Sequence, residues 1–128
     1  MFDQPVDRKA ATSYLIDSRH HIWLAYRGSR GVGFLRAVEL LQLHTTRRQM
    51  FLYEVAVRPS AQRHGVGRAL VSALLRFCRE KDFEEVFVFT DDPSNAEAHA
   101  LYRATGAVTE TPGDRMYVYR LSPSPHGK

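Results

Sequence analysis

Two glycines near the middle of the chain are spaced for the backbone to approach an anion. Gly65 and Gly67 follow an apolar segment, residues 50–58, and stand at the start of an amphipathic stretch that begins at Val66. Glycine lets the backbone come close to a ligand, and the first turn of a helix presents unpaired N–H groups with a partial positive charge. Such a site suits a phosphate. The nearby side chains that can add positive charge are Arg63, His64 and Arg68.

Two common phosphate-binding motifs do not fit this segment. A P-loop requires Lys followed by Ser or Thr after its last glycine, and Arg68-Ala69 stands there. The dinucleotide fingerprint requires a third glycine, and position 70 is Leu70. An ordinary strand-to-helix turn with glycine caps also accounts for the residues. The glycines alone therefore leave the ligand open.

Glu54 is the sharpest candidate for a catalytic side chain. It lies within the nearly continuous apolar run 50–58, and burying a carboxylate there is costly unless another group compensates it. A desolvated carboxylate becomes a better base, which suits removal of a proton from an ammonium substrate. The alternative is an exposed or salt-bridged glutamate at a strand edge.

Further polar candidates follow residue 90. Tyr102 can donate a proton to a departing thiolate, or it can be an aromatic core residue with a satisfied hydroxyl. Asp91 and Asp92 follow a predicted strand, where they can attract a cationic amine or cap the next helix. Cys78 falls on an apolar helical stripe, so we assign it to the core and expect no acetyl-cysteine intermediate.

Apolar periodicity around these residues predicts one α/β domain, residues 1–121, followed by a flexible tail, 122–128. The expected helices are residues 5–18, 66–81 and a helix that Asp92-Pro93-Ser94 opens and that runs to Thr105. The expected strands are residues 21–27, 32–41, 50–58 and 84–90, with a closing hairpin of 107–110 and 115–121. We expect the 50–58 strand to be central and covered on both faces.

Composition narrows the class of protein. The chain has 128 residues, of which 44% are hydrophobic, and it lacks the run of about 20 apolar residues that a membrane span needs. No secretory signal begins it, and one cysteine requires no oxidising compartment, so we expect a cytoplasmic protein without membrane contact. The net charge of +4 comes from scattered residues, and the histidines lack ligand spacing. We therefore expect neither nucleic-acid binding nor a metal.

Two motifs carry a family resemblance. The first, Gln62-x-x-Gly65-x-Gly67, resembles the pyrophosphate-binding motif of the GNAT superfamily of N-acetyltransferases. The second, Asn95-x-x-Ala98-x-x-Leu101-Tyr102-x-x-x-Gly106, resembles that superfamily's later helix. The resemblance covers residues 20–121 and implies an α+β fold, with a GNAT-like central mixed sheet flanked by helices. It also implies that the superfamily's usual first strand and helix are lacking here.

A finer likeness concerns the aminoglycoside 3-N-acetyltransferases. The stretch Leu52-Tyr-Glu-Val-Ala-Val57 is similar to one of their strands, and Thr90-Asp-Asp-Pro93 is similar to the segment that leads into their later helix. Their strand carries Asp where this chain has Glu54. The likeness implies a small-molecule primary amine, with an aminoglycoside as one candidate, as the acceptor.

The resemblance implies acetyl-CoA as the cosubstrate and direct attack by the amine in a ternary complex. Glu54 would be the general base, Tyr102 the general acid, and a backbone N–H near Val55 the oxyanion donor. Asn95 would bind the pantetheine arm, or else cap its helix. The implied cofactor-binding residues are Val55, Ala56, Val57, Gln62, Arg63, His64, Gly65, Val66, Gly67, Arg68 and Asn95. The implied substrate-binding residues are Tyr53, Glu54, Asp91 and Asp92.

Alternatives remain open at this point. The superfamily's first strand and helix often wall the acceptor pocket, so we expect a more open acceptor site, a homodimer that completes the wall, or a trimmed chain. The acceptor can also be a peptide or protein amine. The chain can instead be a non-catalytic acyl-CoA-binding module that kept the cofactor loop. The sequence does not name the amine.

Overall fold

The computed structural model describes residues 7–90, 96–109 and 116–121. The helices within these ranges are α1 (Arg8–Ile16), α2 (Val66–Glu80) and α3 (Ala96–Ala104), with a short 3-10 turn, η1 (Pro59–Ala61). The strands are β1 (His20–Arg27), β2 (Arg30–Leu40), β3 (Gln49–Val57), β4 (Glu85–Phe89) and β5 (Met116–Arg120). The predicted α+β class with a mixed sheet is confirmed. The predicted tail, 122–128, lies outside the described residues.

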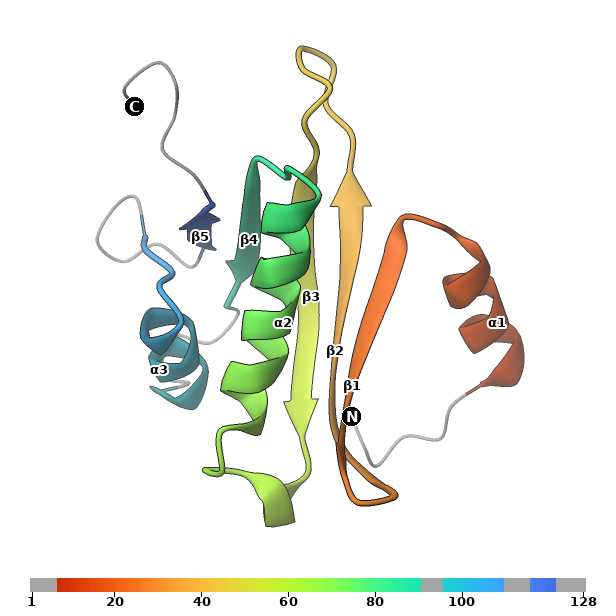
Figure 1. Ribbon diagram of the computed structural model, residues 1–128, viewed down its shortest axis with the longest axis vertical. Helices are drawn as coiled ribbons and strands as arrows, with labels where there is room; N and C mark the ends of the chain where they lie inside the picture. Colours follow the sequence, from red (N-terminus) through yellow and green to blue (C-terminus); the bar gives the residue numbers. More distant parts are fainter. Residues whose placement is uncertain (1–6, 91–95, 110–115, 122–128) are drawn as a thin grey trace.

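The strands form one sheet in the order β1-β2-β3-β4-β5. Neighbouring strands are antiparallel except β3 and β4, which are parallel. A parallel pair needs a crossover connection, and α2 supplies it. In Figure 1, α2 lies in front of the sheet, with α3 and β5 to its left and α1 to its right.

The core lies between α2 and one face of the sheet. Alternate residues of β2 and β3 point toward α2, because successive side chains of a strand face opposite ways. The core residues with 0% exposure on these three elements are Leu35, Ala37, Met50, Leu52, Val71, Leu74 and Cys78. Burial raises the pKa of the Cys78 thiol to about 12, so the thiol is an inert core group. The assignment of Cys78 to the core is confirmed.

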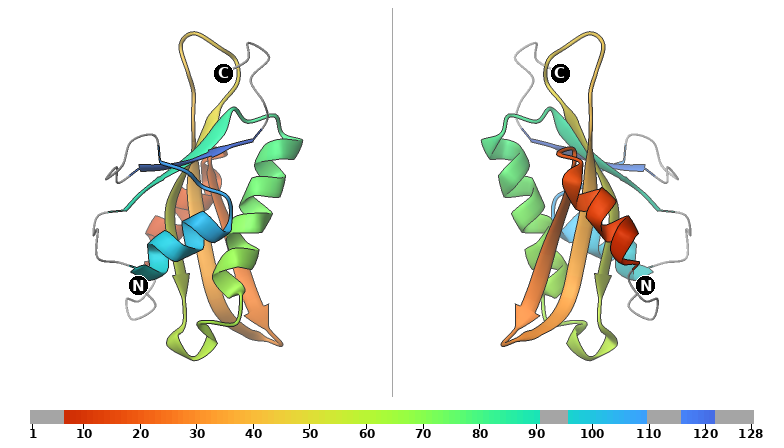
Figure 2. Two further views of the ribbon diagram at one scale, coloured as in Figure 1. Left: turned by 90° about the vertical axis from the view of Figure 1, so that its left-hand side faces the viewer. Right: turned by 90° about the vertical axis from the view of Figure 1, so that its right-hand side faces the viewer.

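Helix α1 lies on the opposite face of the sheet (Figure 2). Its Tyr14 hydroxyl is within hydrogen-bond distance of the backbone oxygens of His21, at 2.8 Å, and Ala37, at 3.2 Å. Asp7 caps the helix by accepting a 3.0 Å hydrogen bond from the Ala10 N–H. The helix is therefore shorter than the predicted 5–18. Residues 1–6, where we expected it to start, lie outside the described part.

The prediction that β3 is covered on both faces is wrong. Tyr53 points to the face opposite α2 and is 57% exposed, and Phe89 of β4 is 53% exposed. Among the described elements, α1 is the helix on this face, and it contacts β1 at the far edge of the sheet. In the described ranges no helix covers the two aromatic rings, although the Arg36 guanidinium lies over Tyr53.

Strands β3 and β4 pair over only a short length. Their register joins Gln49–Phe51 to Glu85–Phe87, and beyond Phe51 the ladder ends. At the same place the register between β2 and β3 shifts, because Arg36 faces Glu54 while Ala37 faces Leu52. Tyr53 is thus the extra residue of a β-bulge, which bends β3. The two parallel strands diverge there and leave an opening.

The chain after α3 returns to the sheet on the other side of β4. β5 pairs with β4 in the antiparallel sense, from Glu85–Arg120 to Phe89–Met116. In the described part of the predicted hairpin partner, residues 107–109, a single bridge joins Val108 to Val118. The predicted turn at 111–114 lies outside the described residues.

Candidate functional site

A cleft of about 1170 Å³ runs from the diverging ends of β3 and β4 to the start of α2. Most residues that the sequence singled out meet there. The predicted site residues that line the cleft are Tyr53, Glu54, Val55, Ala56, Val57, Gln62, Arg63, Gly65, Val66, Gly67, Arg68 and Tyr102. His64 is exposed and does not line it. Asp91, Asp92 and Asn95 lie outside the described residues.

The loop before α2 has the backbone of a ligand-binding turn. Gly65 is the N-cap of α2 with φ of 80°, a conformation that favours glycine. Arg63 also has a positive φ, 65°. Non-glycine residues adopt this region at a cost and concentrate at functional sites. The loop therefore has local strain where the sequence predicts a phosphate.

Two other glycines serve different purposes. A Cβ at Gly67 would lie 3.5 Å from the Leu101 methyl groups, an ordinary contact, so packing does not require glycine there. A Cβ at Gly33 would lie 3.0 Å from Val66 Cγ1 and 3.1 Å from the Ala56 oxygen. Gly33 therefore lets the first turn of α2 lie close against the sheet.

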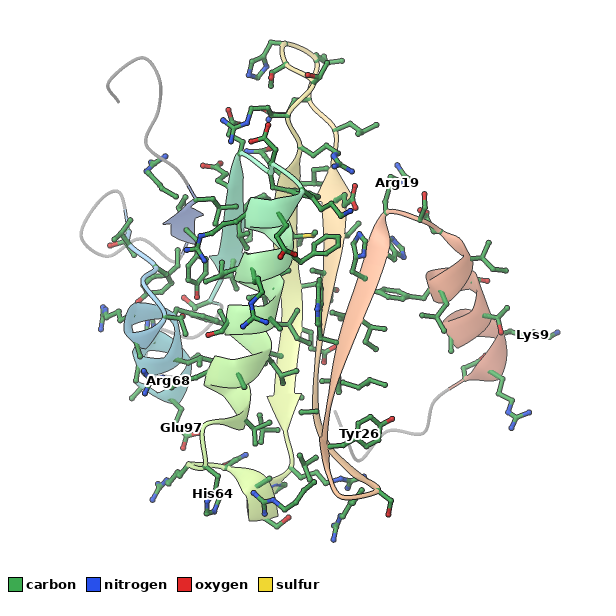
Figure 3. All side chains as sticks on the ribbon, in the orientation of Figure 1. Lys9, Arg19, Tyr26, His64, Arg68 and Glu97 are labelled. Atoms are coloured by element: carbon green, nitrogen blue, oxygen red, sulfur yellow. The ribbon has the colours of Figure 1, made fainter. Side chains whose placement is uncertain are left out.

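The start of α2 is electropositive. The first bond of the helix runs from the Ala69 N–H to the Gly65 oxygen at 2.9 Å, so the N–H groups of the preceding three residues have no partner within the helix. The first turn contains no acidic residue. Figure 3 shows Arg68 near this end of α2, with Glu97 of α3 and then His64 below it in that view. Helix dipole, free N–H groups and arginines together suit a pyrophosphate.

The backbone of β3 faces the opening at alternate residues. The Arg58 N–H donates to the Val32 oxygen at 2.8 Å, so Arg58 points its backbone toward β2. Because backbone groups alternate along a strand, those of Val55 and Val57 point toward the opening. The Gln62 side chain donates to the Val57 oxygen at 3.1 Å. Gln62 thereby fixes the loop against β3.

Glu54 is paired with an arginine that the sequence analysis missed. The Arg36 Nε lies 2.6 Å from Glu54 Oε1, and the two side chains are 34% and 20% exposed. The Arg36 guanidinium carbon also lies 4.1 Å from the centre of the Tyr53 ring and 5.9 Å from that of Tyr14. Arg36 is therefore the compensating group that a carboxylate in this apolar run requires. The glutamate is salt-bridged, although on an interior strand and not at a sheet edge.

Tyr102 reaches the cleft from α3. Its side chain is 6% exposed, and its ring centre lies 5.7 Å from that of Tyr117. Among the described residues, its hydroxyl has no hydrogen-bond partner. Burial raises the pKa of Tyr102 above its ordinary value. The phenol therefore stays protonated at neutral pH, as a proton donor must.

Two further properties concern the whole described chain. Over residues 7–90, 96–109 and 116–121, no group of three or more His, Cys, Asp or Glu side chains is arranged to hold a metal ion. No helix in these ranges is long and apolar enough to span a membrane.

Comparison with known proteins gives curated relatives among the N-acetyltransferases. N-acetyltransferase 8B of Rattus norvegicus is 31% identical over 78 residues, which cover 61% of this chain and 35% of that protein. N-acetyltransferase family 8 member 3 of Mus musculus is 30% identical over 115 residues, or 88% of this chain and 50% of that protein. The chain thus spans from about a third to half the length of these relatives.

Solved structures share the fold. An aminoglycoside acetyltransferase, meta-AAC0020, from an uncultured soil metagenomic sample superposes with a TM-score of 0.77 and 29% identity, over 87% of this chain and 73% of that one. Aminoglycoside N-acetyltransferase AAC(6')-Iy in complex with CoA gives a TM-score of 0.68 at 22% identity, over 81% of each chain, and supports the fold alone.

The family itself is decided by sequence. The model of the acetyltransferase (GNAT) family matches residues 2–107, which is most of the chain and includes both the glycine loop and α3. The relatives and the shared fold agree with that match, and the resemblance found in the two motifs is confirmed. The chain belongs to the GNAT family of acetyltransferases.

Proposed function

We propose that the chain transfers an acetyl group from acetyl-CoA to a primary amine of a small molecule, by direct attack in a ternary complex. One observation carries the proposal. The divergence of β3 and β4 brings Glu54, the electropositive start of α2 and Tyr102 into a single cleft. The family's use of acetyl-CoA supports the choice of donor.

The cleft suits each part of the donor. The pyrophosphate would lie on the free N–H groups at the start of α2, near Arg63 and Arg68. The pantetheine amides would pair with the backbone of Val55 and Val57, which faces the opening between the strands. The thioester would then lie where the strands part. Asn95, as a further pantetheine contact, rests on the sequence motif.

Starting from an ammonium group, the nitrogen must lose two protons and the sulfur must gain one. The amine nitrogen attacks the thioester carbonyl carbon after its ammonium proton passes to Glu54, directly or through water. A backbone N–H near Val55 stabilises the oxyanion. When the C–S bond breaks, the sulfur takes the electron pair and Tyr102 donates its proton to the thiolate. The second proton of the nitrogen then passes to the tyrosinate, directly or through water, which restores Tyr102 and leaves the neutral amide. Binding both substrates in one cleft removes much of the entropic barrier, so no covalent enzyme intermediate is required.

The experiment measures donor binding and thiol release separately. Titration with acetyl-CoA tests the cleft, and thiol release is followed with a panel of primary amines that includes an aminoglycoside. The aminoglycoside belongs in the panel because meta-AAC0020 is an aminoglycoside acetyltransferase at 29% identity. Glu54→Gln and Tyr102→Phe should bind acetyl-CoA and lose turnover. If acetyl-CoA binds but no amine elicits thiol release, the chain is an acyl-CoA-binding module and the proposal is wrong.

A further inference from the structure

Four aromatic rings form a continuous surface on the face of the sheet opposite α2. This aromatic platform consists of Phe51 and Tyr53 of β3 and Phe87 and Phe89 of β4. Phe51 and Phe87 are paired in register and stack, with ring centres 5.1 Å apart and planes inclined by 6°. Tyr53 and Phe89 meet Phe51 edge to face, with ring centres at 5.6 and 5.8 Å. The rings hold one another in fixed positions.

The outer two rings stand at the mouth of the catalytic cleft. Tyr53 and Phe89 each lie two residues beyond the last paired residues of β3 and β4, and both line the cleft. They are 57% and 53% exposed. Tyr53 directly precedes Glu54, so a molecule that brings an amine to Glu54 from this face passes against the two rings.

The charge at this end of the cleft is compensated. The carboxylate of Glu54 is paired with Arg36, whose guanidinium lies over Tyr53. Among the described residues this end offers aromatic surface and one ion pair, without an excess of negative charge. A single ammonium group can join the carboxylate. In the described part of the cleft, the carboxylate besides Glu54 is Glu97 of α3. The two exposed rings add flat apolar surface, which an aromatic group covers better than a polar polyamine does.

We infer that the acceptor is a primary amine carried by an aromatic or similarly flat apolar group. The amine lies at Glu54, and the flat group rests on Tyr53 and Phe89. Binding would remove the half-exposed rings from water, which is the usual source of affinity in a ligand pocket. The inference rests on the proposed acetyl transfer and narrows its acceptor.

The test compares matched amines on the full chain. Phenethylamine and tryptamine are compared with n-butylamine and with kanamycin, at saturating acetyl-CoA, by thiol release. The arylalkylamines should exceed n-butylamine in kcat/KM by about tenfold or more, mainly through KM. Equal kcat/KM for the aromatic and aliphatic amines, or a preference for kanamycin, would overturn the inference while leaving acetyl transfer intact. Acetyl-CoA binding with no thiol release for any amine would overturn the proposed function and this inference with it.

Variants of the platform separate recognition from packing. Phe89→Ala should raise KM for phenethylamine about tenfold, with KM for acetyl-CoA unchanged, and Phe89→Tyr should restore it. Tyr26→Ala is the matched control, because Tyr26 is 62% exposed on β1, at the far edge of the sheet, and does not line the cleft. If Phe89→Ala changes the oligomeric state and not the amine KM, the platform is a contact between chains and the inference is wrong.

Discussion

Replacement of Tyr102 by phenylalanine separates packing from proton donation in the cleft. The ring is 6% exposed and lies against Tyr117, and phenylalanine keeps that packing. The hydroxyl has no hydrogen-bond partner among the described residues, so its loss breaks no described bond. We therefore expect the free energy of unfolding to change by less than about 0.5 kcal/mol.

The size of the kinetic effect follows from two pKa values. Burial raises the pKa of Tyr102 above its ordinary value of about 10, whereas an ordinary thiol has a pKa of about 8.5. Proton transfer from the phenol to a free thiolate is therefore uphill by at least about 2 kcal/mol. General acid catalysis contributes about 10²–10⁴-fold, and this mismatch favours the lower end. We expect kcat to fall about a hundredfold, with KM for acetyl-CoA within about twofold.

The assay is steady-state thiol release, with acetyl-CoA affinity and unfolding measured on the same samples. Tyr119→Phe is the matched control, because Tyr119 is also buried and its hydroxyl lies 2.9 Å from Thr105 Oγ1, away from the cleft lining. The control should lose about 1 kcal/mol of stability and keep its kcat. A Tyr102→Phe protein that retains kcat within about threefold of the parent would refute the proton-donor role. An equal loss in Tyr119→Phe would refute it as well.

Three further predictions follow from the site and the core. Glu54→Gln should lower kcat by about 10²-fold or more in the thiol-release assay, while the unfolding free energy changes by less than about 1 kcal/mol because its pair with Arg36 is partly exposed. Gly33→Ala should lower the unfolding free energy by about 1–3 kcal/mol in chemical denaturation, since a Cβ would lie 3.1 Å from a backbone oxygen. Gly67→Ala should keep its stability and bind acetyl-CoA about tenfold more weakly in a titration. Equal behaviour of the two variants would contradict the separate roles of these glycines. Since burial raises the pKa of Cys78 to about 12 and an unfolded thiol titrates near about 8.5, the unfolded chain loses this proton first as pH rises. Between about pH 9 and 10.5, the unfolding free energy of the parent should therefore fall with pH more steeply than that of Cys78→Ala, by about 1.4 kcal/mol per pH unit. Equal slopes for the two proteins would show that burial does not raise the pKa of this thiol.

The features that could be predicted from the sequence are those that depend on local residue patterns. The apolar stripe of α2 and the glycines before it located the helix, the loop and the cofactor end of the cleft. The order of two motifs identified the family before any contact was known. These features depend on residues close together in the chain, and their spacing carries the information.

What the sequence could not predict depends on how strands pair. Arg36 lies 18 residues from Glu54, and only the register between β2 and β3 makes them neighbours. The bulge at Tyr53 changes that register by one residue, and no turn or proline marks it. The aromatic run of β3 suggested burial on both faces, because hydrophobicity does not say whether a partner layer is present. Exposure of Tyr53 and Phe89 is therefore a finding of the structure.

The pairing between β3 and β4 ends early, at Phe51 and Phe87, and leaves a seam of unpaired backbone groups in the sheet. A bound donor molecule would fill this seam. Beyond Phe51, the backbone groups of Val55 and Val57 face none of the described strands, so a bound pantetheine would act as a short surrogate strand. Occupancy of the cleft and stability of the sheet would then be coupled by mass action. The free protein would open first along this seam, and the donor would act as both cosubstrate and structural ligand.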